Sequence, residues 1–279
     1  MKENVLAKKK NGMAALMGIL LLFAVSVAGI VFGAIAIERH SSSPMLAAGI
    51  VMLVAGIVMV VVSLILLCGL KVLKPQEALV LTLFGRYVGT LKEDGFYFVN
   101  PFCTSFNPAA KTKLSQSGDV SAASMLAAAN GSTTVEAGSN KISLKIMTLN
   151  NNKQKINDCL GNPVEIGIAV TWRVVDTAKA VFNVDNYKEF LSLQCDSALR
   201  DIVRIYPYDV APNVDTTGDG IADEGSLRGS SEIVAGKIRD EIQRRVAEAG
   251  IEIVEARITY LAYAPEIAAV MLQRQQASA

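Results

Sequence analysis

The sequence predicts an α+β domain that is preceded by two transmembrane helices and followed by the start of a further helix. Two long apolar stretches without charge lie near the N-terminus. After them, short apolar runs typical of strands are mixed with stripes of apolar residues at helical spacing. The chain beyond the apolar stretches is long enough for one large domain or two small ones.

The two apolar stretches cover residues 13–37 and 44–70, and neither contains a charged side chain. Each is longer than the roughly 20 residues with which a helix crosses a hydrocarbon core. Charges are costly at mid-bilayer, so their absence predicts two transmembrane helices joined by the short linker 38–43. The lipid bilayer is therefore an expected partner, and the cell (inner) membrane is the expected location of a multi-pass protein.

The orientation of these helices follows from the flanking lysines. Three lysines at residues 8–10 precede the first stretch, and Lys71 and Lys74 follow the second. The linker has only one arginine, which stands beside a glutamate. The positive-inside rule then predicts that the tail 1–12 and the domain after residue 70 are cytoplasmic and that the linker is external.

Two other interpretations of the apolar stretches remain open. The first stretch could be a signal peptide with a cleavage site at residues 34–36 (AIA), but its apolar run is too long for one. Even then, the second stretch would cross inward and leave the same domain in the cytoplasm. The pair could also dip into the bilayer and return, with Pro44 at the bend, although each arm is long enough to span alone.

The domain is expected to begin with a meander of short strands directly after the second apolar stretch. Gly85 and a turn signal at residues 93–95 separate the apolar runs. The side chains of Phe96, Phe98 and Phe102 could touch lipid headgroups, but we expect them to pack in the core of the meander. The expected strands are residues 77–84, 87–91 and 95–99.

A polar stretch at residues 109–141 interrupts the domain. It has almost no aromatic or large aliphatic residues, so it is expected to be a flexible insertion, with a short helix conceivable at 121–130. Strand character returns at residues 142–150 and 164–175. The second of these contains the only tryptophan and is apolar on both faces, which predicts a central, covered strand.

Amphipathic helices are predicted after this strand. Asp176 and Asn186 are placed to cap helices that cover residues 177–182 and extend to about residue 206. Another helix is expected at 227–249. The remaining expected features are a C-cap at Gly250, a bulged strand at 251–260 and the start of a C-terminal helix at 265–279.

The residue inventory argues against the common catalytic sites. The only histidine is His40, in the linker between the apolar stretches, so the domain has no Ser/His/Asp or Cys/His set. No phosphate-binding glycine motif occurs, and no cofactor is expected. The 27 basic and 26 acidic residues nearly balance, so nucleic acid is not an expected partner. We therefore expect a protein that is not an enzyme.

Metal sites and disulfides are not expected either. The four cysteines form no C-x-x-C pair, which favours reduced thiols, and Cys68 is expected to be a buried structural thiol rather than a lipidation site. A weak calcium-loop candidate is formed by Asp215, Asp219 and Asp223. It lacks the bidentate glutamate of such loops, so a polar surface loop is the favoured interpretation.

Several sequence blocks, in order, resemble the SPFH superfamily of stomatin-like, prohibitin-like and flotillin-like proteins, and bacterial SPFH membrane proteins most closely. The resemblance covers residues 71–279, with the SPFH domain at 71–264. The blocks are KPQEALVLTLFGRYVGTLKEDGFYFVNPF at 74–102, NPVEIGIAVTWRVVDTAKAVFNVDNYKEFLSLQCDSALR at 162–200 and ITYLAYAPEIAAVMLQRQQASA at 258–279.

This resemblance implies two small α+β subdomains and a non-enzymatic role. Such proteins form rings or cages on membranes, organise membrane microdomains and regulate membrane proteases and channels. The family's oligomers use a long helix after the last block, and here the chain ends within that helix, so we expect the natural protein to be longer. The insertion at 109–141 is longer than the family's pattern.

Three functional hypotheses follow from the sequence. The favoured one is a non-enzymatic membrane scaffold that assembles as a homo-oligomeric ring or cage. The second is a regulatory or adaptor subunit of a membrane protease complex that does not self-assemble. The third is a membrane hydrolase with Ser–Lys chemistry, to which no residue pattern points.

Overall fold

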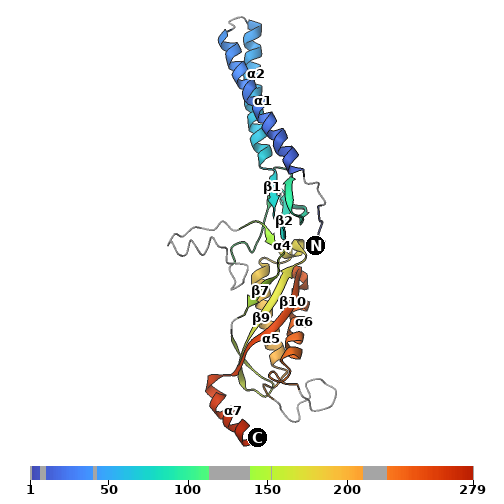
Figure 1. The fold of residues 1–279 in the computed structure, drawn as a ribbon, viewed down its shortest axis with the longest axis vertical. Helices are drawn as coiled ribbons and strands as arrows, with labels where there is room; N and C mark the ends of the chain where they lie inside the picture. The colour runs from blue at the N-terminus through green and yellow to red at the C-terminus, as the bar shows by residue number, and fades with distance from the viewer. Residues whose placement is uncertain are drawn as a thin grey trace. The chain divides into compact units, whose positions relative to one another are not determined.

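The computed structural model describes residues 2–6, 11–39, 43–112, 139–151, 153–209 and 225–278 (Figure 1). Most of the predicted insertion, the helix considered at 121–130, His40 and the calcium-loop candidate Asp215, Asp219 and Asp223 lie outside these residues. The chain divides into two compact units. We call residues 4–106 the membrane-helix unit and residues 1–3 with 107–279 the helix–sheet unit.

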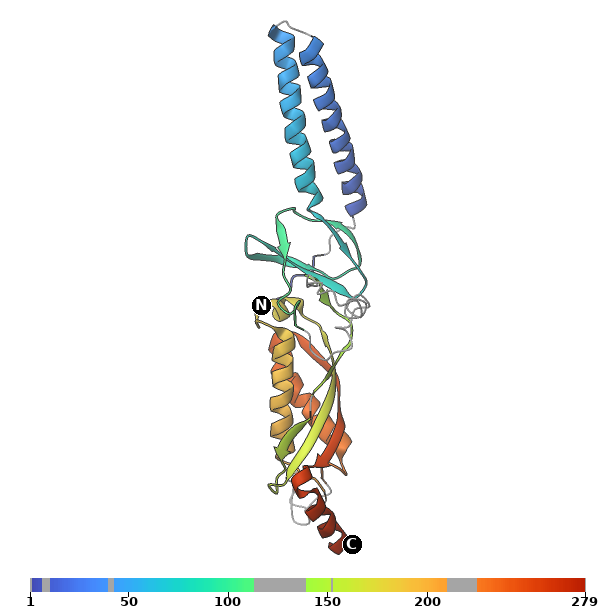
Figure 2. The same cartoon turned by 90° about the vertical axis from the view of Figure 1, so that its left-hand side faces the viewer.

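The membrane-helix unit begins with two long helices, α1 (Gly12–Arg39) and α2 (Ser43–Leu67), which lie side by side in Figures 1 and 2. Both consist almost entirely of Leu, Ile, Val, Ala, Met and Gly. With a rise of 1.5 Å per residue, their 28 and 25 residues extend over about 42 and about 38 Å. Both are thus longer than the hydrocarbon core of a bilayer, which is about 30 Å thick.

Five short strands complete this unit. The antiparallel pair β1–β4 forms one sheet, and β3-β2-β5 forms another. Buried residues of both sheets form one apolar cluster. The strands are β1 (Leu70–Leu73), β2 (Glu77–Leu83), β3 (Arg86–Leu91), β4 (Gly95–Phe98) and β5 (Cys103–Ser105). The cluster contains Leu73, Leu79, Leu81, Leu91, Tyr97, Val99 and Cys103.

The helix–sheet unit is built around the long strand β9 (Pro163–Val174). It pairs with β10 (Ile251–Tyr263) along one edge and with β7 (Met147–Asn150) and β8 (Gln154–Asn157) along the other. The described part of this unit also has the short strand β6 (Ile142–Ser143). Alternate residues of β9, Trp172 included, are fully buried, whereas the other face is mostly half-buried. The central position of this strand is as predicted, but only one of its faces is fully covered.

Helices account for the covered face of the sheet. Buried residues of α5 (Tyr187–Val203) and α6 (Ser231–Val246) recur every three or four positions, because one stripe of each helix turns inward. The stripe of α6 is Val234, Ile238, Ile242 and Val246. Figure 2 shows both helices alongside β9 and β10. The unit also contains α4 (Thr177–Phe182), the 3-10 turn η1 (Ala247–Ala249) and α7 (Pro265–Ser278).

The ends of these helices follow the capping residues in the sequence. The side chain of Asp176 accepts a hydrogen bond from the backbone of Lys179, and Asn186 accepts bonds from the first turn of α5. The carboxylate of Glu3 also accepts hydrogen bonds from the backbone and hydroxyl of Thr177. Gly250 adopts the left-handed conformation, with φ of 66°, after the last turn, as expected of a C-cap.

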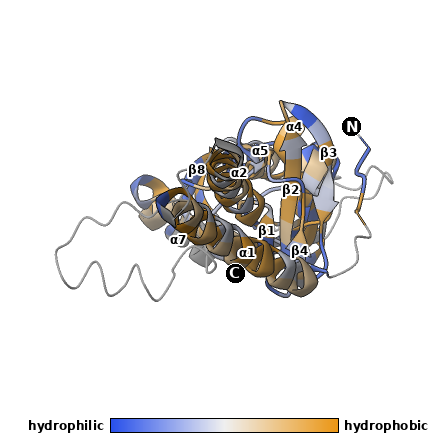
Figure 3. Cartoon of the chain, turned by 90° about the horizontal axis from the view of Figure 1, so that it is seen from above, coloured by the Kyte–Doolittle hydropathy of each residue, from blue (hydrophilic) through white to orange (hydrophobic). Residues whose placement is uncertain are grey.

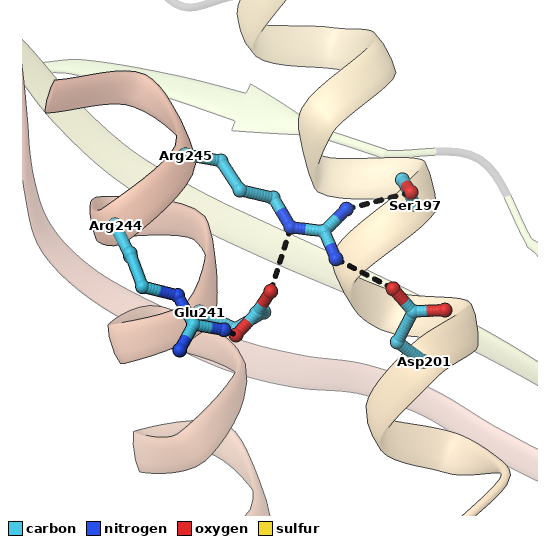
Figure 4. Close-up of polar contacts among 5 residues, drawn as sticks. All are labelled: Ser197, Asp201, Glu241, Arg244 and Arg245. Carbon is cyan, nitrogen blue, oxygen red and sulfur yellow. Dashed lines mark hydrogen bonds and ion pairs between the residues drawn. The ribbon is translucent and has the colours of Figure 1, made fainter. Parts of the chain in front are cut away.

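A polar cluster joins α5 to α6 (Figure 4). The guanidinium of Arg245 contacts Glu241 at 2.7 Å, Ser197 at 2.7 Å and Asp201 at 2.5 Å. Arg244 also pairs with Glu241. Only 24% of the Arg245 side chain is exposed, so solvent screens its pair with Glu241 less than it screens the exposed Arg257–Glu255 pair.

The predicted fold class is confirmed: two apolar helices precede a domain of mixed helix and sheet, and a helix lies at the C-terminal end. Some details differ. The strand expected at 142–150 is divided into β6 and β7, and β1, β5 and β8 were not expected. The second apolar helix ends at Leu67 rather than at residue 70, and β1 begins at Leu70. The last strand extends to Tyr263 and has a second register shift after Ile258.

Two predictions about single side chains were wrong. Phe102 is 58% exposed rather than packed in the core, because it follows Pro101 in the exposed turn between β4 and β5. Cys68 is exposed rather than buried, and its thiol lies 3.7 Å from the carbonyl oxygen of Leu64 in the last turn of α2. Phe96 and Phe98 are half-buried.

Candidate membrane-anchoring site

The outer surfaces of α1 and α2 are covered by large apolar side chains. Leu21 and Val51 are each 68% exposed, and Phe32 is 62% exposed. Each Å² of apolar surface left in water costs about 25 cal/mol. Exposure of so many apolar side chains to water would therefore be unfavourable. Figure 3 shows both helices coloured as hydrophobic along their length. By length and composition, both helices are suited to cross a membrane.

The seam between the two helices consists of small residues, Gly and Ser, and of one larger residue, Ile19. Buried positions recur every seven residues, which keeps one side of each helix facing its neighbour. The small size of the glycines and serines allows the backbones to approach closely, as is common between membrane helices. The seam consists of Ile19, Ser26 and Gly33 on α1 and of Gly49, Gly56 and Ser63 on α2.

The glycines of this seam are needed for the close approach. A Cβ atom added to Gly33 would lie 2.9 Å from the backbone nitrogen of Leu53. One added to Gly56 would lie 2.7 Å from Cγ1 of Ile30. The backbones would therefore have to separate for any larger residue. Sequence reasoning missed this seam, although the seven-residue spacing of small residues was a signal that could have revealed it.

The hydroxyl groups of the two buried serines of the seam are each hydrogen-bonded within their own helix. The hydroxyl of Ser26 donates to the carbonyl of Phe23, and that of Ser63 donates to the carbonyl of Val60, each at 2.7 Å. In a medium without water, a hydroxyl without a partner would cost several kcal/mol, on the order of 2–7. The seam is therefore compatible with hydrocarbon on all sides.

The start of α1 and the end of α2 are held directly against the strands. The backbone nitrogen of Val99, just after β4, donates to the carbonyl of Gly69 at 2.9 Å. Gly69 has no room for a side chain, because an added Cβ would lie 2.4 Å from the oxygen of Val99. At the start of α1, Gly12 contacts Phe96 in the same way, with 2.7 Å to an added Cβ. The strands of this unit thus begin where the apolar helices end.

Two exposed aromatic rings are stacked where β2 ends and just before β5 begins. Phe84 is 87% exposed and Phe102 is 58% exposed, and their rings stack with centroids 6.4 Å apart. Phe84 has a positive φ of 49°, which is uncommon for a bulky residue and holds its ring out at the β2–β3 turn. We call these two residues the aromatic pair.

Hydrogen bonds fix the position of the aromatic pair. The side chain of Asn100 accepts from the backbone nitrogen of Phe102 at 3.0 Å, and its carbonyl accepts from Cys103 at 2.9 Å. This turn directly follows Val99, whose backbone binds the end of α2. Leu83, next to Phe84, is paired with Cys103. Phe102 thus follows closely after Val99, whose backbone binds Gly69 just beyond α2, and aromatic rings are enriched at the ends of membrane helices.

The thiols of the helix–sheet unit are poorly suited to nucleophilic chemistry. Burial raises the pKa of Cys195 to about 12, with a smaller contribution from Asp196. Burial and the neighbouring carboxylate of Asp158 also raise the pKa of Cys159. Both thiols are therefore protonated at neutral pH, whereas a cysteine nucleophile acts as the thiolate.

Candidate metal ligands do not gather within the described ranges. No group of three or more His, Cys, Asp or Glu side chains lies close enough there to hold an ion. The carboxylate of Asp158 is buried, but it accepts from the backbones of Leu160, Asn162 and Tyr208, so it holds a loop together. The calcium-loop candidate stays a prediction.

Comparison with protein families identifies a family for this chain. The sequence model of the SPFH domain / Band 7 family matches residues 71–279. The match begins at the start of the strands that follow α2 and covers most of the chain. It confirms the resemblance found in the sequence blocks. No curated protein sequence matches the chain.

Proposed function

Because the chain belongs to the SPFH domain / Band 7 family, whose members are generally membrane-associated scaffolds and often oligomeric, we propose that it is a non-enzymatic scaffold that assembles side by side on a membrane. Its assemblies would organise microdomains and regulate membrane-protein partners. The observation that carries the proposal is the short, hydrogen-bonded junction between the helix pair and the strands. It keeps the first strands close to the ends of the apolar helices.

The junction supports assembly for a simple geometric reason. A domain on a long linker would sample many heights and orientations, which makes a regular lateral contact entropically costly. Here only Cys68 and Gly69 separate α2 from β1. Each copy would present its strands at one height above the lipid, so neighbouring copies would meet with matching surfaces.

We also propose that the two helices span the inner membrane, with residues 38–43 outside and both flanks in the cytoplasm. Backbone pairing of residues 4–6 with β3 supports one part of this arrangement, because the N-terminal tail and the strands must then share one side. A cysteine introduced as Ser42→Cys, in a background lacking the exposed native cysteines, should react with an impermeant maleimide from the periplasmic side. Protection from that side would contradict two full spans.

The scaffold proposal is tested by the mass of the full-length protein extracted in native nanodiscs. We expect large homo-oligomers with a narrow mass distribution. A monodisperse monomer would overturn the proposal. A complex of one copy with a stoichiometric foreign protease, without self-contact after mild crosslinking, would instead favour the adaptor hypothesis.

The contact of the aromatic pair with lipid has its own test. A variant with Phe84→Trp and Trp172→Phe places the only tryptophan at the β2–β3 turn. Its fluorescence should be quenched by brominated lipids in reconstituted vesicles. The control is the unchanged protein, whose only tryptophan, Trp172, is fully buried and should be quenched much less. Equal quenching of the two would contradict a specific lipid contact of the aromatic pair.

A further inference from the structure

The N-terminal segment of residues 4–6 docks as an extra strand on β3. The backbone nitrogen of Leu6 donates to the carbonyl of Thr90 at 2.9 Å, and the nitrogen of Thr90 donates to the carbonyl of Asn4 at 2.9 Å. Val5 is paired with Thr90 in parallel orientation. These bonds cover the edge of β3 that β2 leaves open, and an open edge is a site where other chains can add. Figure 3 shows the N-terminal chain beside β3.

Side chains add specificity to this docking. The amide of Asn4 donates to the carbonyl of Val88 at 3.3 Å, and its backbone nitrogen donates to the hydroxyl of Tyr87 at 3.2 Å. The side chain of Leu6 packs against the apolar cluster of the unit. The segment is therefore recognised by a polar contact at its first residue and an apolar contact at its third.

Gly89 shapes the site for this segment. A Cβ atom added there would lie 2.5 Å from Cγ of Leu6 and 2.9 Å from the carbonyl oxygen of Asn4. Any other residue would displace the docked segment. By contrast, a Cβ atom added to Gly236 on α6 would meet no atom within 4 Å. Gly89 also has a φ of 157°, which itself favours glycine, so the absence of a side chain suits both the strand and the occupant of the site.

We propose that β3 is a strand-docking site through which neighbouring copies exchange their N-terminal segments, so that residues 4–6 of one copy dock on β3 of the next. The proposal rests on the side-by-side assembly proposed above. The hydrogen bonds and the Leu6 contact are all retained when the segment comes from an identical chain. Exchange of identical elements is a low-cost route to association for this reason.

Two further features favour a second copy as the occupant. The segment is connected to α1 by residues 7–11, which could extend over at most about 18 Å, so it remains near the membrane surface. Copies confined to one membrane present segment and site in the same thin layer, which raises their effective concentration. Each exchange would then link two copies without any new contact surface.

Disulfide crosslinking tests the exchange in full-length assemblies. One copy carries Asn4→Cys and a second, differently tagged copy carries Val88→Cys, both in a background with Cys68→Ser and Cys159→Ser. We expect a crosslinked pair of the two tagged chains after mild oxidation. A single chain with both cysteines serves as the control for geometry and should form an internal disulfide when expressed alone at low density.

Glycine variants provide the matched comparison. Gly89→Ala in the Val88→Cys chain should reduce the intermolecular crosslink several-fold, whereas Gly236→Ala should leave it unchanged. Assemblies of undiminished mass without the intermolecular crosslink would overturn exchange and leave the scaffold proposal standing. A monomeric mass would overturn both. An equal crosslink in the Gly89→Ala and Gly236→Ala proteins would also contradict the assigned docking site.

Discussion

The two units of this protein place large and small side chains in opposite ways. In the helix pair α1–α2, glycine and serine are buried at the seam, and Leu, Val and Phe are exposed. In the helix–sheet unit, Trp172, Leu191 and Ile238 are fully buried, and charged residues cover the surface. The difference shows which solvent each unit is suited to. Water drives large apolar groups inside, whereas hydrocarbon gives no such drive and leaves close packing as the main attraction.

The largest effect is expected from the core of the helix–sheet unit. Ile238→Ala removes a fully buried side chain from α6 and should lower the free energy of unfolding by about 2–5 kcal/mol. Urea unfolding of the full chain in detergent, followed by the fluorescence of Trp172, measures it. The control is Ile233→Ala on the same helix, whose side chain is 63% exposed, with an expected change within about 0.5 kcal/mol. Similar losses in both variants would contradict the assigned core.

A smaller loss is expected at the seam of the helix pair, where added volume rather than removed volume is harmful. Gly56→Leu forces the backbones apart and should destabilise the pair by about 1–3 kcal/mol. Gly18→Leu adds the same side chain where the structure has open space and should have little effect. SDS titration, with energy transfer between dyes on α1 and α2, reports the separation. If Gly18→Leu separated the helices as readily, the seam would be wrongly assigned.

The ion pair between α5 and α6 should contribute less than either kind of packing. Arg245→Ala removes contacts to Glu241 and Asp201 at a partly covered site, and we expect a loss of about 1 kcal/mol. The loss should decrease as salt is added, because salt screens the pair. Arg257→Ala, which removes an exposed pair with Glu255, should produce no measurable change in urea unfolding. A larger loss for Arg257→Ala would reverse this ranking.

The smallest effect concerns the start of α7. The hydrogen bond from Lys155 lowers the pKa of Glu266, so this contact stabilises the helix start above the ordinary glutamate pKa. The contribution is lost as the pH falls through the lowered pKa of the folded state, where the carboxylate is protonated. Hydrogen exchange of the first turn of α7 should therefore increase, relative to its intrinsic rate, on acidification. A Lys155→Met variant should show a weaker pH dependence, because a backbone hydrogen bond also lowers the pKa of Glu266. An unchanged pH dependence would contradict the assigned role of Lys155.

Local signals allowed much of the fold to be predicted from the sequence. The caps at Asp176 and Asn186 and the left-handed Gly250 depend on neighbouring backbone atoms, so a few residues suffice to recognise them. The family resemblance at residues 71–279 was likewise evident from ordered blocks of sequence. The long apolar runs were evident because their length exceeds any ordinary strand.

Features that depend on distant partners were missed. The short strands β5 and β8 have little apolar pattern of their own and are held by β2 and β9. The exposure of Phe102 depends on the turn after Val99, and the strand role of residues 4–6 depends on Gly89, more than eighty residues away. Such pairings are fixed by tertiary structure and leave no local period in the sequence.

The central claim is that the helix pair and its fixed strands hold neighbouring copies side by side on a membrane. Imaging of the full-length protein in its native membrane by electron cryomicroscopy tests this claim most directly. We expect closed rings or regular arrays in which the strands that follow α2 lie at the lipid surface and contact the next copy. Isolated single copies with no lateral contact, in membranes where the protein is intact, would contradict the account.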